Sequence, residues 1–386
     1  MRIGIDATQI GISTEDRGGV YHYVLYLIQA LRDIDRENEY VLSFTFFRRK
    51  HFANYQEVRR RLGNGGDNFK VVLSRCPNLL LFPLRLPIDF FTGSLDVFHG
   101  PAHFVAPVFS GKAVVTIHDF DFLRIPHCLD SQWVKFKDKY TRLSVQRAAM
   151  IIAVSHFMKD EIVAELGVQK DKVRVVYHGV SPKFIPIRDE RILNRLREKY
   201  QIKDHYILFV GGFNPNKNLL RLLEGYRELS GYTTHDYCLV ITGTKKSIMS
   251  TFNVIMQKVY DLGLQKRIIF TGYVSDEELP ALYSGADFFI FPSIYEGFGM
   301  PVVEAMACGT PVITSNVCSL PEVAGDAALL VDPYSSSSIA EGMHKLLLDN
   351  HLRKDLVSRG FERAKLFTWE KTARETLKVY KEVCFL

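Results

Sequence analysis

Two glutamates flank a glycine-rich turn in the second half of the chain, and their spacing suits the binding of hydroxyl groups around a central anion. Glu296 stands directly before the sequence Gly297-Phe298-Gly299, and Glu304 follows it within the segment FPSIYEGFGMPVVEAMACGTP. Carboxylates accept hydroxyl hydrogen bonds strongly, so two of them can hold polyols on both sides of one group. The segment therefore predicts a ligand site.

A strand and a helix are needed to position these residues. The apolar run at 286–291 predicts a buried strand, and Pro301 predicts the first turn of a helix, where its missing N–H costs nothing. Gly309 and Pro311 predict its end. A strand, turn and helix in this order direct backbone N–H groups and the positive end of the helix dipole at one spot, which suits a phosphate. The candidate donors are the N–H groups of Phe298, Gly299, Met300, Val302 and Val303.

The two carboxylates complete this predicted site. Helical side chains lean toward the N-terminus, so Glu304 can reach back beside the phosphate position, while Glu296 offers an acceptor from the preceding loop. Together these groups describe a site for a diphosphate between two polyols, as in a nucleotide sugar. The alternative is an exposed helix residue and a turn residue that bind nothing.

The segment resembles the E-x7-E signature of the family 4 retaining glycosyltransferases of the GT-B fold, with Glu296 and Glu304 as its two acids. EGFG followed by PVVEAMACGTPVI carries the resemblance, which is strong over 206–367 and weaker over 1–19 and 114–180. It implies an α/β fold in which two Rossmann-like domains face each other across a cleft. It also implies that a final helix, starting at Trp369, crosses back to the first domain.

The alternation of strand-like and helical runs supports that fold class from the residues alone. RIGID, YVLSFTFF, FKVVLS, DVFHG, KAVVTIHD, MIIAVS and KVRVVY precede the segment VSPKFIPI, after which a similar series begins with HYILFVGG. This rhythm is typical of parallel sheets covered by helices. We predict a first domain of residues 1–184 plus 369–386 and a second of 185–368. By resemblance, the first binds the acceptor and the second the donor.

Further candidate donor contacts follow other predicted strands. Gly18 and Gly19 precede a helix and allow a close approach of backbone to an anion, although an ordinary turn is the alternative. Lys217, in FVGGFNPNKNLL, matches the family's lysine that neutralises the diphosphate. Gly212 and Asn216 stand where the family often has arginines, so either Asn216 supplies a hydrogen bond instead or the missing positive charge comes from elsewhere. Resemblance also places the loops of Gly243 and Val274 beside the base and ribose.

His118 follows an apolar strand, at the end where open α/β sheets bind ligands. Resemblance places it beside the donor sugar, with Asp119 orienting it or binding the acceptor; a core histidine is the alternative. Asp119 and Asp121 also imitate a D-x-D metal motif. We predict no metal, because N–H groups and Lys217 already balance the phosphate charge.

Composition limits the remaining possibilities. Residues 1–186 hold 25 Lys and Arg against 19 Asp and Glu, and the rest holds 24 of each, so the net charge of +6 arises in the N-terminal half. The basic segment 46–62 and the apolar segment 79–91 suggest peripheral contact with the inner face of a membrane, or else a solvated helix and a buried connection. Six scattered cysteines, no signal peptide and no long apolar run predict a cytoplasmic protein.

The resemblance implies a retaining transferase that moves a hexose from a nucleoside diphosphate sugar to a saccharide or lipid-linked glycan. His118, Glu296 and Lys217 are the expected catalytic residues. GDP-mannose is the first candidate donor, followed by UDP-glucose and dTDP-rhamnose, and we expect no cofactor and no nucleic-acid partner. The alternatives are an epimerase or hydrolase on the same fold and a non-catalytic nucleotide-sugar-binding protein. A dinucleotide oxidoreductase is disfavoured because no G-x-G-x-x-G follows the first strand.

Overall fold

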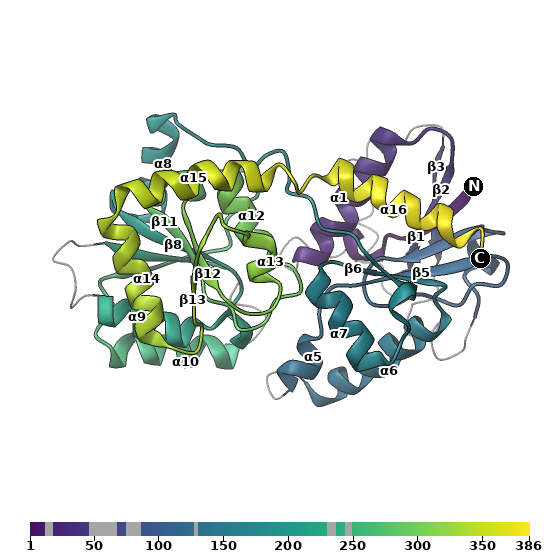
Figure 1. The fold of residues 1–386 in the computed structure, drawn as a ribbon, viewed down its shortest axis with the longest axis horizontal. Helices are drawn as coiled ribbons and strands as arrows, with labels where there is room; N and C mark the ends of the chain where they lie inside the picture. The colour runs from purple at the N-terminus through teal and green to yellow at the C-terminus, as the bar shows by residue number, and fades with distance from the viewer. Residues whose placement is uncertain (12–17, 46–67, 75–85, 127–129, 230–236, 244–248) are drawn as a thin grey trace. The chain divides into compact units, whose positions relative to one another are not determined.

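The computed structural model describes residues 1–11, 18–45, 68–74, 86–126, 130–229, 237–243 and 249–386. These form two compact units, Met1–Gly179 with Trp369–Leu386, and Val180–Thr368 (Figure 1). The first unit ends at Gly179, whereas the sequence placed the boundary at residue 184. Val180 belongs to the second unit because its N–H donates to the Phe367 carbonyl at 2.9 Å.

The first unit is built on a parallel sheet with the strand order β3-β2-β1-β4-β5-β6-β7. Its strands are β1 (Arg2–Asp6), β2 (Glu39–Thr45), β3 (Phe69–Ser74), β4 (Val97–Gly100), β5 (Lys112–Ile117), β6 (Met150–Ala153) and β7 (Val173–Val175). Its α-helices are α1 (Gly19–Ile34), α4 (Asp89–Thr92), α5 (Asp121–Arg124), α6 (Ser131–Arg147), α7 (His156–Leu166) and α16 (Trp369–Val383). Short 3-10 turns lie at η1 (Thr8–Gly11) and η4 (Lys170–Lys172). Strands β2, β4, β5 and β6 are buried along most of their length, whereas the edge strand β3 is largely exposed.

The C-terminal helix α16 packs in the first unit beside α1, as the sequence predicted (Figure 1). Its buried face follows helical periodicity, and the Tyr380 hydroxyl lies 2.6 Å from Nδ1 of the buried His99. Glu382 pairs with Arg174 through two carboxylate–guanidinium contacts. Apolar burial and satisfied polar groups therefore hold the last helix on this unit.

The second unit repeats the design with a six-stranded parallel sheet in the order β10-β9-β8-β11-β12-β13. The strands are β8 (Tyr206–Val210), β9 (Cys238–Thr242), β10 (Ile268–Gly272), β11 (Phe288–Phe291), β12 (Val312–Ser315) and β13 (Leu329–Val331). The helices are α8 (Glu190–Tyr200), α9 (Leu219–Leu229), α10 (Met249–Asp261), α11 (Leu279–Gly285), α12 (Met300–Ala307), α13 (Leu320–Ala324), α14 (Ser336–Leu348) and α15 (Asn350–Ala364), with a 3-10 turn at η5 (Pro215–Lys217). Both sheets confirm the predicted fold class.

Each sheet has one point at which the strand order reverses, between β1 and β4 in the first unit and between β8 and β11 in the second. Open α/β sheets bind ligands beyond the carboxyl ends of the strands at such points, since the loops there diverge to opposite faces. In the second unit these loops carry Lys217 and Glu296. The topology thus favours the same place as the motif.

No helix in the described ranges is long and apolar enough to cross a bilayer. The basic segment 46–62 and most of the apolar segment 79–91 lie outside the described residues.

Candidate functional site

The turn between β11 and α12 requires glycine at Gly299. Its φ of +99° lies in the region that L side chains avoid, and a Cβ there would lie 2.6 Å from Cδ2 of Leu320. The helix starts at Met300, so Pro301 occupies its first turn as predicted. Backbone conformation and packing therefore both demand the glycine that the motif supplies.

The start of α12 offers fewer free N–H groups than the sequence suggested. The Val302 N–H, proposed above as a phosphate donor, donates to the Gly299 carbonyl at 3.0 Å. The left-handed turn at Gly299 brings that carbonyl within reach. Gly299 and Met300, which precede this bond, stay the better candidates for an anion at the helix start.

Lys217 and Glu296 are brought together directly. Nζ of Lys217 lies 2.5 Å from Oε1 of Glu296, and their side chains are 17% and 13% exposed. The Ser293 hydroxyl lies 2.7 Å from the same Oε1. Nζ also lies 5.1 Å from the centre of the Phe291 ring, on which a cation is favourable. The cation and the carboxylate therefore satisfy each other.

Asn216 is used in joining the two loops. Its buried side-chain amide donates to the Tyr295 carbonyl at 3.1 Å, and its own carbonyl accepts the Ile294 N–H at 2.8 Å. These bonds fix the loop after β8 to the loop after β11. Asn216 consequently positions its neighbour Lys217. At Gly212, the other position where the family often has arginine, no described atom lies within 4 Å of where a Cβ would stand.

Glu304 lies on α12 next to the buried Tyr283, whose hydroxyl donates to Oε2 at 3.1 Å. Burial raises the pKa of the Glu304 carboxyl to about 7, and the charge of Asp276 adds to the shift, while the Tyr283 hydrogen bond opposes it. The carboxyl therefore titrates near neutral pH, well above an ordinary glutamate. A ligand that donates hydroxyl groups to it would favour the ionised form.

Gly243 and Val274 follow β9 and β10, at the carboxyl end of the same sheet. A Cβ at Gly243 would lie 1.9 Å from the Gly211 carbonyl oxygen, so close backbone packing alone requires this glycine. The Val274 side chain is buried, which leaves only its backbone for the predicted contact with a base. The structure thus gives Gly243 a structural reason that the sequence could not show.

In the first unit, His118 is buried at the end of β5 and its Nε2 donates to the Pro101 carbonyl at 2.8 Å. Burial lowers the pKa of His118, so the ring is neutral and Nδ1 carries the lone pair. This tautomer suits the predicted role as an acceptor of a sugar hydroxyl.

Gly18 caps α1 in an extended conformation, and no described atom would meet a Cβ at Gly18 or Gly19.

The two acids of the D-x-D sequence face a lysine that sequence analysis missed. Nζ of Lys137, on α6, lies 2.7 Å from Oδ1 of Asp121 and 3.3 Å from Oδ1 of Asp119. An ammonium therefore occupies the position between the carboxylates. In the described part of the chain, no group of three or more His, Cys, Asp and Glu side chains has a metal-binding arrangement. Only tertiary proximity joins Lys137 to these acids.

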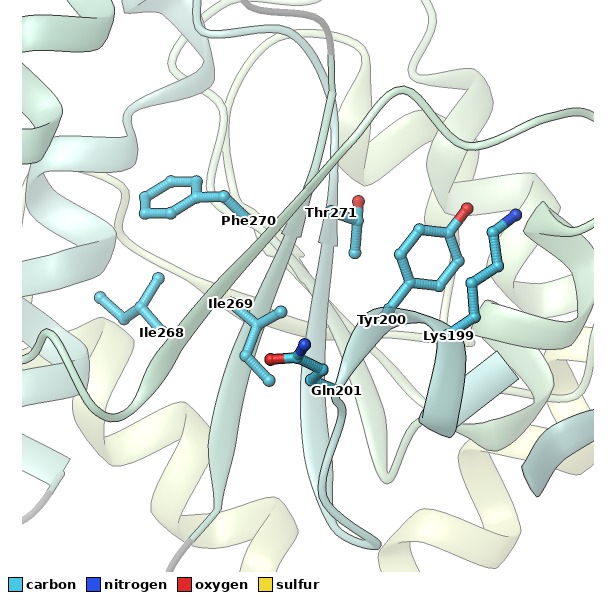
Figure 2. Close-up of a pocket in the computed structure, with 7 residues that line it drawn as sticks. All are labelled: Lys199, Tyr200, Gln201, Ile268, Ile269, Phe270 and Thr271. Carbon is cyan, nitrogen blue, oxygen red and sulfur yellow. The ribbon is translucent and has the colours of Figure 1, made fainter. Parts of the chain in front are cut away.

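A cavity of about 550 Å³ lies elsewhere in the second unit, beside the edge strand β10 (Figure 2). It is lined by Lys199, Tyr200, Gln201 and residues 268–271, and includes none of the predicted site residues. Lys199 and Tyr200 both bind Glu278, at 2.6 and 3.0 Å. Because it lies at an edge strand and away from the reversal of strand order, this cavity does not mark the donor site.

Comparison with known proteins connects this geometry to a family. Residues 194–363 match the glycosyl transferases group 1, and residues 17–184 match Glycosyltransferase Family 4. The chain is 35% identical over 287 residues to the O-antigen chain mannosyltransferase B of Escherichia coli, covering 74% of each protein. It is 30% identical over 231 residues to the serotype-specific mannosyltransferase WbdA of Escherichia coli, covering 59% of this chain and 28% of that longer protein.

The fold has close counterparts among solved structures. Anabaena Alr3699/HepE in complex with UDP and glucose aligns with a TM-score of 0.75 at 16% identity, over 99% of this chain and 100% of that one. The chain therefore belongs to the glycosyltransferases, with a Family 4 first domain and a group 1 second domain on the GT-B fold. Within that class it is a hexosyltransferase that uses a nucleotide sugar.

The Lys217–Glu296 pair predicts an unusual response to the substitution Glu296→Gln. Removing the carboxylate frees Lys217 for the phosphates, so the affinity for a nucleoside diphosphate should rise by about fivefold, or about 1 kcal/mol. Transfer should fall, because Glu296 is the predicted sugar ligand. Titration calorimetry with GDP and UDP measures the first effect and a turnover assay the second.

The matched control is Glu277→Gln, which removes an exposed partner of Lys183 in the same unit and should change neither quantity. Weaker nucleotide binding by Glu296→Gln would mean that this carboxylate itself contacts the nucleotide.

Proposed function

We propose that the protein is a retaining mannosyltransferase that moves mannose from GDP-mannose to a saccharide or lipid-linked glycan. The observation that carries the proposal is the placement of Lys217 and Glu296 at the reversal point of the second sheet. The family model that matches this unit and the relative named as an O-antigen chain mannosyltransferase support it. GDP is proposed as the nucleotide because the segments around Lys217 and Glu296 resemble those of bacterial mannosyltransferases.

The proposed mechanism is electrostatic. Lys217 leaves Glu296 for the diphosphate, the first N–H groups of α12 donate to a phosphate oxygen, and Glu296 then accepts hydroxyl hydrogen bonds from the sugar. His118 accepts a further hydroxyl at Nδ1. The bond from the anomeric carbon to the phosphate oxygen breaks as the acceptor oxygen bonds on the same face. The acceptor proton passes to the leaving diphosphate. Because the new bond forms on the face that the diphosphate leaves, the anomeric configuration is retained.

This mechanism predicts activity without a divalent cation, because Lys217 and backbone N–H groups supply the positive charge that a metal would bring. The Lys137 ammonium between Asp119 and Asp121 supports the same proposal.

The decisive experiment incubates the purified protein with GDP-mannose, UDP-glucose or dTDP-rhamnose and a panel of mannosides, with EDTA present. We expect transfer from GDP-mannose, with the α-configuration of the product shown by NMR coupling constants, and a large loss of turnover in Lys217→Ala. An inverted product would overturn the retaining mechanism, and a strict need for Mn²⁺ would overturn the metal-free one. Release of free mannose with every acceptor would indicate a hydrolase.

Glu304 predicts a measurable proton release. Ribose hydroxyls that donate to its carboxylate lower the raised pKa, so nucleotide binding at pH 7 should release about half a proton per site, and none at pH 9. Calorimetry in buffers of different ionisation enthalpy measures this number. Glu304→Gln should bind GDP more weakly and release no proton; unchanged release would assign the proton to another group.

We also propose peripheral membrane contact through the basic segment 46–62, which lies outside the described residues. The charge excess of the N-terminal half supports it, since each basic residue near an anionic surface adds about 1 kcal/mol. Sedimentation with anionic and neutral liposomes at low salt tests the proposal. Binding should require anionic lipid and weaken on replacing Arg59, Arg60 and Arg61 with Ser, and equal recovery with both liposomes would contradict it.

A further inference from the structure

Three segments of the first unit bring a charged cluster to the carboxyl end of its sheet. His103 follows β4, Asp119 and Asp121 follow β5, and Lys137 comes from α6. β4 is one of the two strands at which the strand order reverses, where open α/β sheets bind ligands. The cluster therefore lies where a ligand of this unit is expected.

Asp119 and Asp121 are the members of the cluster that a ligand can reach, because their side chains are 31% and 32% exposed, whereas those of Lys137 and His103 are 12% and 6% exposed. Asp119 differs from Asp121 in facing both Lys137 and His103. Its Oδ1 lies 3.3 Å from Nζ of Lys137 and 3.8 Å from Nε2 of His103, and it accepts the Asp121 N–H at 3.4 Å. These contacts all involve Oδ1, so the protein holds the carboxylate through this one oxygen.

The groups that face Asp119 are Lys137, His103, His118 and Asp121. Lys137 lowers the pKa of Asp119 most strongly, with smaller contributions from the others, against the opposing effect of burial. Burial and the neighbouring Asp119 charge raise the pKa of Asp121. Lys137 thus favours the ionised form of Asp119 over that of Asp121.

The cluster also carries features that stability alone does not explain. His103 has a φ of +65°, which is rare for a residue other than glycine, and its buried Nδ1 has no hydrogen-bond partner among the described residues. Burying an ammonium beside two carboxylates is at best weakly stabilising. Strain and perturbed titration at a sheet's ligand-binding edge are typical of functional sites.

We propose that Lys137 is a positioning residue for the acceptor: it holds the Asp119 carboxylate so that its outward oxygen accepts a hydroxyl hydrogen bond from the acceptor saccharide. The inference rests on the proposed transfer to a saccharide. In this proposal the two acids of the D-x-D sequence bind the Lys137 ammonium in place of a metal ion. Lys137 lies outside the sequence motifs and would be a further residue of the acceptor site.

The test compares Lys137→Met with Lys137→Arg, which restores the cation, and with Lys135→Met, an exposed lysine on the same helix. With GDP-mannose as donor and methyl α-mannoside as the acceptor probe, Lys137→Met should raise the acceptor KM about tenfold or more. Lys137→Arg should recover most of this loss, and Lys135→Met should match the parent. The GDP affinity should stay unchanged in all three.

A second measurement is independent of transfer. Carbon-13 NMR of protein labelled at aspartate follows the Asp119 carboxyl signal, which is assigned by its loss in Asp119→Asn. In the parent protein this carboxyl should stay ionised at pH values well below the ordinary aspartate pKa. In Lys137→Met it should titrate at a clearly higher pH, and in Lys137→Arg near the parent value. Thermal unfolding of each variant shows whether the fold is kept.

An unchanged acceptor KM, or an equal loss of GDP affinity, would overturn the role of Lys137 in acceptor binding. An Asp119 titration that ignores Lys137→Met would overturn its control of the carboxylate. A parent protein that transfers to no saccharide would count against the proposed function, while the NMR titration would still decide whether Lys137 governs Asp119.

Discussion

The site in the second unit depends on two loops that hold each other in place. The loop after β8 carries Asn216 and Lys217, and the loop after β11 carries Ser293 and Glu296. The Asn216 amide donates to the Tyr295 carbonyl in the loop after β11. Nζ of Lys217 and Oε1 of Glu296, 2.5 Å apart, form an ion pair between the same two loops. Because both groups of this pair are largely removed from water, removing either one would leave the other with a buried, unpaired charge. In the proposed mechanism, the pair exchanges partners when the charged donor binds.

That exchange is a way to couple the binding of phosphate and sugar. An anionic diphosphate competes for Lys217, and the released carboxylate then needs hydroxyl donors, which the sugar supplies. The diphosphate without its sugar leaves Glu296 with a weaker set of partners. Under the proposed mechanism, the same ion pair would favour a complete nucleotide sugar over its nucleotide part.

Each unit pairs a largely buried lysine with acidic side chains at the carboxyl end of its sheet, but the number of acids differs. In the second unit, Lys217 pairs with Glu296 beside the start of α12. In the first, Lys137 pairs with both Asp119 and Asp121, and the neutral rings of His118 and His103 lie beside each other. A parallel sheet brings such residues together because each strand end contributes one short loop, and each loop needs only one or two polar side chains.

The sequence by itself determined the fold class, the turn at Gly299 and the family. Apolar runs of strand length and the proline and glycine positions are local signals, because they reflect backbone conformation and burial that a short segment already specifies. It did not show that Asn216 joins two loops by hydrogen bonds or that close backbone packing requires Gly243. Nor did it show that the Val302 N–H donates to the Gly299 carbonyl, or that Lys137 faces Asp119. Those facts concern which atoms meet after the chain folds, and hydrogen bonds and charges depend on distances that only the tertiary structure sets.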